Sequence, residues 1–103
     1  MSDAEVLKII RDRLSGRIDV KRVILFGSRA TGKATPESDY DVLVIADTEI
    51  PFIRRQGLAL LDLGTRAFSV DLLVYTPEEA ERESRMLGSA VYWAEREGKE
   101  YVA

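Results

Sequence analysis

Three short apolar runs, separated by segments with helical spacing, place the strongest limit on how this chain can fold. The runs are RVILF (22–26), YDVLVIA (40–46) and VDLLVY (70–75). Runs of this length that are rich in Val, Ile and Leu are typical of buried strands. Helices that alternate with buried strands cover the faces of a single sheet. We therefore predict an α/β (α+β) fold, with a mixed β-sheet flanked by helices.

The segments around these runs carry helix signals. S-x-x-E over residues 2–5 is a capping box, and apolar residues at positions 6, 10 and 14 then predict a helix that Gly16 ends. TPEE (76–79) is a second capping box, with proline at the first helical position. A last helix is predicted over about 84–97, ending at Gly98.

Two other segments have weaker patterns. Residues 51–68 begin with proline and have apolar side chains at roughly helical spacing, although Gly57 and Gly64 interrupt them. The tail KEYVA (99–103) is predicted to pair as a short strand.

Length and composition bound the kind of protein. The chain has 103 residues, which corresponds to one domain, 1–103, with a modest core. No apolar run is long enough to cross a bilayer, and the first ten residues lack the regions of a signal peptide. We therefore expect a soluble, cytoplasmic protein with no membrane partner.

The residue types that are missing limit the chemistry. The sequence has no Cys and no His, which excludes disulfides, thiolate metal sites and an imidazole base. Any chemistry must use carboxylates, hydroxyls, Lys, Arg or the backbone. The net charge is −3, and this acidic balance argues against direct nucleic-acid binding, which favours a basic surface.

The segment GSRATGKA (27–34) is close to a phosphate-binding P-loop. It has Gly, four residues and Gly-Lys, but then Ala34 where Ser or Thr would bind magnesium. Pro36 follows, and five residues separate Lys33 from Asp39, where the next strand begins. Because a P-loop continues into a helix for which there is no room, we reject this interpretation.

A different nucleotide site fits the same turn. Gly27 follows a predicted strand and allows the backbone to turn sharply and approach a ligand closely. Ser28 offers a hydroxyl and is expected to be the N-cap of a short helix over 29–31, whose backbone donors suit phosphate.

Three acids follow this turn in the chain. Asp39 and Asp41 are separated by one residue at the start of a strand, so their carboxylates share a face about 7 Å apart, while Tyr40 points into the core. Such a pair repels unless a cation lies between them, and magnesium prefers oxygen ligands. Asp71 stands alone in an apolar strand, where a buried acid needs a partner. If the second and third strands are neighbours, Asp71 joins the pair and can accept a proton from an attacking hydroxyl.

Each feature also has an ordinary structural interpretation. Gly27-Ser28 alone would be a simple turn, Asp39 a cap, and Asp71 a satisfied buried acid. Together, Gly27-Ser28, ten residues and Asp39-Tyr40-Asp41 resemble the G-S-x10-D-x-D signature of the nucleotidyltransferase superfamily related to DNA polymerase beta. The segments LFGSRATG, SDYDVLV, VDLLVYTPEE and EREGKEYV resemble its minimal nucleotidyltransferase branch over nearly the whole chain.

This resemblance implies roles for the site residues. Asp39 and Asp41 would bind two Mg2+ ions, and Asp71 would complete a catalytic and metal-binding triad. Gly27, Ser28 and neighbouring backbone groups would hold the nucleotide triphosphate. Many relatives read G-S-x-A-R-G, whereas position 31 here is Thr, so that Arg29 and Lys33 remain the candidates for a further phosphate contact.

The resemblance also implies a function. The chain would transfer AMP from ATP to a hydroxyl of a protein partner, acting as an antitoxin that adenylylates a HEPN-type ribonuclease toxin. Two alternatives stay open, namely a non-catalytic module that neutralises a partner by contact, and a small-molecule nucleotidyltransferase with a pocket shared between subunits of an oligomer. The sequence leaves the acceptor, the nucleobase and the oligomeric state open.

Overall fold

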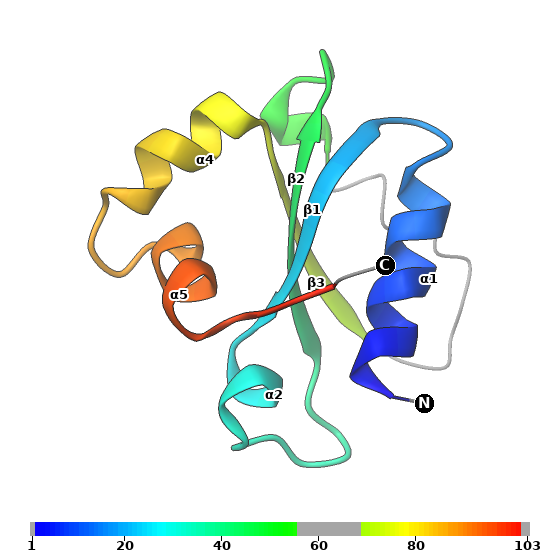
Figure 1. The fold of residues 1–103 in the computed structure, drawn as a ribbon, viewed down its shortest axis with the longest axis vertical. Coiled ribbons are helices and arrows are strands. Elements are labelled where there is room, and N and C mark those ends of the chain that lie inside the picture. Colours follow the sequence, from blue (N-terminus) through cyan, green and yellow to red (C-terminus); the bar gives the residue numbers. More distant parts are fainter. Residues whose placement is uncertain (1, 56–68, 102–103) are drawn as a thin grey trace.

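The computed structural model of the chain describes residues 2–55 and 69–101, and these form three layers. Helix α1 lies on one side of a sheet, and α4 and α5 lie on the other side (Figure 1). The elements in chain order are α1 (Asp3–Leu14), β1 (Asp19–Phe26), α2 (Ser28–Thr31), β2 (Tyr40–Asp47), a 3₁₀ turn (Phe52–Arg54), β3 (Val70–Tyr75), α4 (Pro77–Ser84), α5 (Ala90–Glu97) and β4 (Lys99–Glu100). The predicted three-strand framework and flanking helices are confirmed.

The described strands form a mixed sheet in the order β3-β2-β1-β4. Strands β1 and β2 are antiparallel, β2 and β3 are parallel, and β4 pairs antiparallel with β1 at Ile24 and Leu25. The expected short strand in the tail is therefore present. Of the segment 51–68, only the 3₁₀ turn after Pro51 lies among the described residues, so the helical interpretation of 56–68 falls outside them.

The core has two parts, one on each face of the sheet. The predicted apolar positions of α1, Val6, Ile10 and Leu14, are fully buried against one face, and the other face packs beneath α4 and α5. The α1-side core includes Val6, Ile10, Leu14, Val23, Leu25, Tyr40, Val42, Val44, Leu72 and Val74. The α4/α5-side core includes Ile24, Leu43, Ile45, Ala80, Val91 and Ala94. Because strand side chains alternate, this division assigns each strand residue to a face.

Both predicted capping boxes form. Ser2 and Glu5 satisfy each other's backbone N–H at the start of α1, and Thr76 and Glu79 do the same at the start of α4. The predicted last helix over 84–97 is wrong in its start. Helix α4 ends at Ser84, and α5 begins only at Ala90, because Gly88 turns the chain with φ +85° and the Ser89 hydroxyl then caps a new helix.

A buried arginine joins the 3₁₀ turn to the sheet and to α4. Arg55 is 5% exposed; it donates hydrogen bonds to the carbonyls of Ile50 and Val74 and forms an ion pair with Glu79. Burial opposes ionisation of Glu79, but hydrogen bonds from Arg55 and from the Thr76 backbone outweigh it and lower the pKa of that carboxyl. The buried charge of Arg55 is thus paired with the charge of Glu79.

No helix among the described residues is long and apolar enough to cross a membrane.

The junction between α5 and β4 depends on glycine, which gives a test of the fold. A Cβ at Gly98 would lie 2.3 Å from the carbonyl oxygen of Ala94 and 2.5 Å from Cγ2 of Ile24. We expect Gly98→Ala to lower the free energy of unfolding by about 1–3 kcal/mol, measured by urea denaturation. Gly16→Ala is the matched control, because its Cβ would meet only the Arg13 carbonyl oxygen, at 3.9 Å. Equal effects of the two changes would contradict this packing.

Candidate active site

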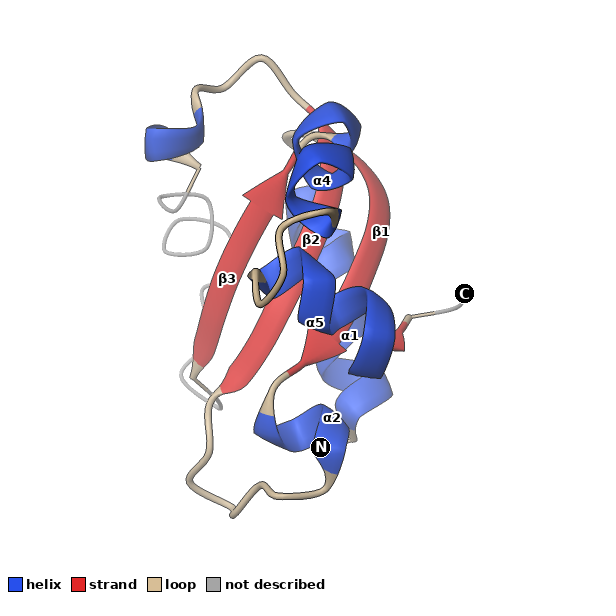
Figure 2. Cartoon of the chain, turned by 90° about the vertical axis from the view of Figure 1, so that its left-hand side faces the viewer, coloured by secondary structure: helices blue, strands red, loops and turns tan. Residues whose placement is uncertain are grey.

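The predicted acids lie at the same end of the sheet, and two of them are neighbours. In the strand register, Asp41 pairs with Phe26 of β1 on one side and with Asp71 of β3 on the other. The end of β1 and the starts of β2 and β3 therefore lie at the same end of the sheet, where α2 also lies (Figure 2). The expectation that the third strand neighbours the second is confirmed, and the two strands bring Asp41 and Asp71 side by side.

The two acids also share a face. Tyr40 belongs to the α1-side core and is 7% exposed, as predicted, whereas Leu43 belongs to the α4/α5-side core. Asp41 alternates with Tyr40 and so lies on the α4/α5 side. Asp71 precedes Leu72, which belongs to the α1-side core, and lies on the same side as Asp41. Asp39 stands two residues before Asp41, just outside β2.

Two details of the sequence interpretation need correction. Asp71 was expected to be buried, but it is exposed, because it is only the second residue of a strand at the edge of the described sheet. Ser28 was expected to cap α2, but it is the first helical residue, and Gly27 occupies the N-cap position. The Ser28 hydroxyl forms no hydrogen bond with residues 2–55 or 69–101.

Gly27 is in direct contact with Asp41. Its φ of +72° and ψ of −152° form a conformation that essentially only glycine adopts. A Cβ built on Gly27 would lie 2.2 Å from Oδ2 of Asp41, far inside van der Waals contact. The missing side chain therefore lets the carboxylate lie against the turn that follows β1.

The cationic and hydroxyl groups of the turn differ in their availability. The Thr31 hydroxyl donates to the carbonyl oxygens of Gly27 and Ser28, at 3.2 and 3.4 Å, so it is used within α2. Lys33 is exposed, and its ammonium group has no partner in the described part of the chain. The threonine at position 31 thus turns back onto its own helix.

Arg29 is held by the loop that leads into β2. Its Nε and Nη2 donate to the Ser38 carbonyl oxygen at 3.0 and 2.8 Å, and Nη2 also donates to that of Pro36 at 3.3 Å. The guanidinium carbon lies 4.0 Å from the centre of the Tyr40 ring, in a cation–π contact. The prediction that Arg29 binds nucleotide stays a prediction, and these contacts indicate a further role.

The acids interact electrostatically. Burial raises the pKa of Asp41, and the negative charges of Asp71 and Asp39 raise it further. No group of three acidic side chains in residues 2–55 and 69–101 is arranged to hold a metal ion. The two findings agree, because repulsion acts over several ångströms, whereas magnesium ligands must approach to about 2.1 Å. The oxygen-only donors and their mutual repulsion fit a hard divalent cation, which would require the carboxylates to rotate together.

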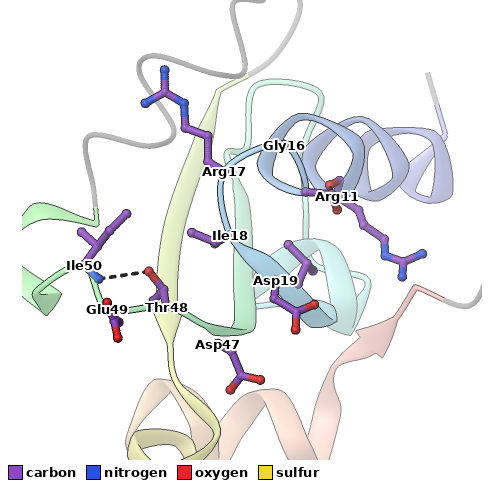
Figure 3. A pocket seen from close by; sticks show the side chains of 11 residues that line it. Arg11, Gly16, Arg17, Ile18, Asp19, Asp47, Thr48, Glu49 and Ile50 are labelled. Carbon is purple, nitrogen blue, oxygen red and sulfur yellow. Dashed lines mark hydrogen bonds between the residues drawn. The ribbon is translucent and has the colours of Figure 1, made fainter.

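A separate hollow lies at the opposite end of the sheet. It has a volume of about 900 Å³ and is bordered by the end of α1, the start of β1 and the residues after β2 (Figure 3). Both basic and acidic side chains border it, namely Arg11, Arg17, Asp19, Asp47 and Glu49. None of the predicted site residues borders it, so its size does not make it the candidate active site.

The sequence matches a known protein family. The family model described as the nucleotidyltransferase domain matches residues 4–64, more than half of the chain. This chain belongs to the nucleotidyltransferase family. The matched region contains the Gly27 turn, Asp39 and Asp41, whereas Asp71 lies beyond it.

One curated protein is similar to this nucleotidyltransferase domain over part of its length. A protein of Methanocaldococcus jannaschii named as a candidate protein adenylyltransferase is 39% identical over 49 residues, which cover 48% of this chain and 47% of that protein. The chain thus spans about half the length of the curated relative that it matches.

Solved structures share the fold. A toxin–antitoxin structure with AMP-PNP has a TM-score of 0.62 at 24% identity, covering 97% of this chain and 72% of that chain. An MntA-HpeT toxin–antitoxin variant has a TM-score of 0.61 at 25% identity, covering 100% and 73%. A candidate nucleotidyltransferase from Sulfolobus solfataricus has a TM-score of 0.58 at 26% identity, covering 75% and 68%.

The raised pKa of Asp41 predicts a stability effect. An acid whose pKa is raised by folding favours the folded state below its ordinary pKa, and this contribution is lost as pH rises through the raised value. At neutral pH without divalent cations, we expect Asp41→Asn to raise the melting temperature by a few degrees. The gain should disappear in acid, and added magnesium should stabilise the wild type more than the variant.

Asp47→Asn is the control for this melting experiment. Asp47 is exposed at the opposite end of β2, where it lies 3.6 Å from Lys21. Its replacement should give no gain in melting temperature. A melting temperature of Asp41→Asn below that of the wild type in a chelator at neutral pH would contradict the repulsion.

Proposed function

We propose that this chain transfers AMP from ATP to a hydroxyl group of a protein partner. The observation that carries the proposal is the contact between Gly27 and Asp41, which places the turn and its Ser28, whose hydroxyl has no hydrogen-bond partner in residues 2–55 and 69–101, directly beside the acids. A nucleotide held by that turn would present its phosphates to carboxylates that need a cation. An acid pair held apart from the turn would have no such use.

The residues of the chain have distinct parts in this reaction. Ser28 and the backbone of the turn would bind the triphosphate, and Asp39, Asp41 and Asp71 would hold two magnesium ions. Bound magnesium would supply positive charge at the α-phosphate and make the attacking hydroxyl more acidic. Asp71, exposed beside Asp41, would accept the proton of that hydroxyl. The acceptor oxygen forms a bond to the α-phosphorus, and the bond to the pyrophosphate oxygen breaks.

The comparisons support the choice of acceptor. One relative is named as a protein adenylyltransferase, and the similar structures include toxin–antitoxin proteins, one of them with AMP-PNP. A toxin as acceptor, of the HEPN ribonuclease type, and a role as antitoxin in the cytoplasm follow as the finer part of the proposal. The described domain is small, so a partner that brings its own hydroxyl would supply the acceptor.

Labelled ATP tests the proposal directly. The protein is incubated with [α-³²P]ATP, magnesium and the product of the neighbouring gene, and the proteins are separated by gel electrophoresis. We expect label on the partner protein. Label on a small molecule would show that the acceptor is a small molecule and not a protein. Inhibition of the partner without any label would favour neutralisation by contact.

Substitution of the acids tests the catalytic roles. We expect Asp39→Asn and Asp41→Asn each to reduce the initial rate of label transfer by about a thousandfold or more, because each loses a charge that the reaction needs. Circular dichroism should show both variants folded. Asp47→Asn, on the same strand but at its far end, should transfer label at the wild-type rate. Transfer that survives in both Asp39→Asn and Asp41→Asn would rule out this mechanism.

A further inference from the structure

Asp39 is not held in place by the strands of the described sheet. Asp39 lies outside β2 and is exposed, so it takes no part in the strand pairing of the described sheet. The loop after α2 passes around the end of the sheet before it enters β2 (Figure 2). Its own contacts are local, because Ser38 and Thr35 hydrogen-bond to each other. A carboxylate that shares an ion with Asp41 needs a fixed backbone.

The contacts of Arg29 enclose Asp39 on both sides. Two of its N–H groups donate to the carbonyl oxygen of Ser38, the residue before Asp39. Its guanidinium carbon lies over the ring of Tyr40, the residue after Asp39, at 4.0 Å from the ring centre. Tyr40 is buried in the α1-side core, so Arg29 ties the loop to a residue of that core.

Arginine is the side chain that can do both. A planar guanidinium donates hydrogen bonds in its plane while its face lies on an aromatic ring, whereas a lysine ammonium is a single compact charge. Among the described residues, the hydrogen-bond acceptors of Arg29 are backbone carbonyls and not carboxylates. Its contacts therefore fix the backbone and leave the charges of the acids available to a cation.

We propose that Arg29 is a positioning residue, which holds the backbone on either side of Asp39 so that Asp39 and Asp41 reach one ion together. The inference rests on the proposed function for its catalytic consequence. The positional effect itself stands on the contacts of Arg29 alone. It differs from the expectation that Arg29 touches the nucleotide in what a substitution should change. If the charge is kept but the shape of the side chain is changed, the positioning role predicts a lower kcat, whereas a nucleotide contact predicts a higher KM for ATP.

The first test is the kinetics of Arg29→Lys, which keeps the charge and loses the paired hydrogen bonds and the ring contact. We expect kcat for adenylyl transfer to fall about tenfold or more, with the KM for ATP changed by less than about threefold. Arg13→Lys, an exposed arginine on α1, is the matched control and should leave both unchanged. A raised KM with an unchanged kcat would assign Arg29 to the nucleotide and overturn the proposal.

The second test needs no activity. The Tyr40 amide donates to the Ser69 carbonyl oxygen at 2.9 Å, next to the clamped loop. In Arg29→Lys, hydrogen exchange of this amide should speed up by about tenfold, while that of the Ile10 amide in α1 stays at the wild-type rate. Unchanged exchange at Tyr40 would overturn the positioning role. If the wild type transfers no label but the Tyr40 amide loosens, the proposed function fails and the positioning of this loop by Arg29 is upheld.

Discussion

The contact between Gly27 and the Asp41 carboxylate is the constraint on which the rest of the site depends. It requires a residue without a side chain at the end of β1, in a conformation that other residues avoid. It also requires β1 and β2 to be antiparallel neighbours in a register that places Phe26 opposite Asp41. Turn and acid come from different strands, so neither one alone makes a site.

The sheet adds the third acid through a different kind of pairing. Strands β2 and β3 are parallel, and their common direction places the starts of both strands at one edge. Asp41 and Asp71 are then neighbours on one face, and the pKa of Asp41 rises through burial and through the charges of Asp71 and Asp39. Repulsion among these carboxylates destabilises the fold when no cation is bound, and a cation between them would remove that repulsion. The stability of this edge and its proposed chemistry therefore depend on the same carboxylates.

Several features of the fold could be predicted because their causes are local. The capping boxes before α1 and α4 consist of residues three positions apart, and the strands appear as apolar runs. The predicted start of the last helix is wrong because residues 84–97 were taken as one continuous helix across Gly88, where a positive φ breaks it. The signal was present in the Gly-Ser pair, since a glycine followed by a capping serine ends one helix and starts another.

The sequence by itself determined which groups are available to the chemistry, because a chain without His or Cys leaves carboxylates, hydroxyls and cations, and the spacing from Gly27 to Asp41 is a property of the chain. Tertiary structure decided which of them meet. The exposure of Asp71 follows from the place of β3 at the edge of the described sheet, and the contacts of Arg29 follow from the path of the loop around the end of that sheet. Both depend on residues distant in sequence, and local propensity carries no information about such contacts.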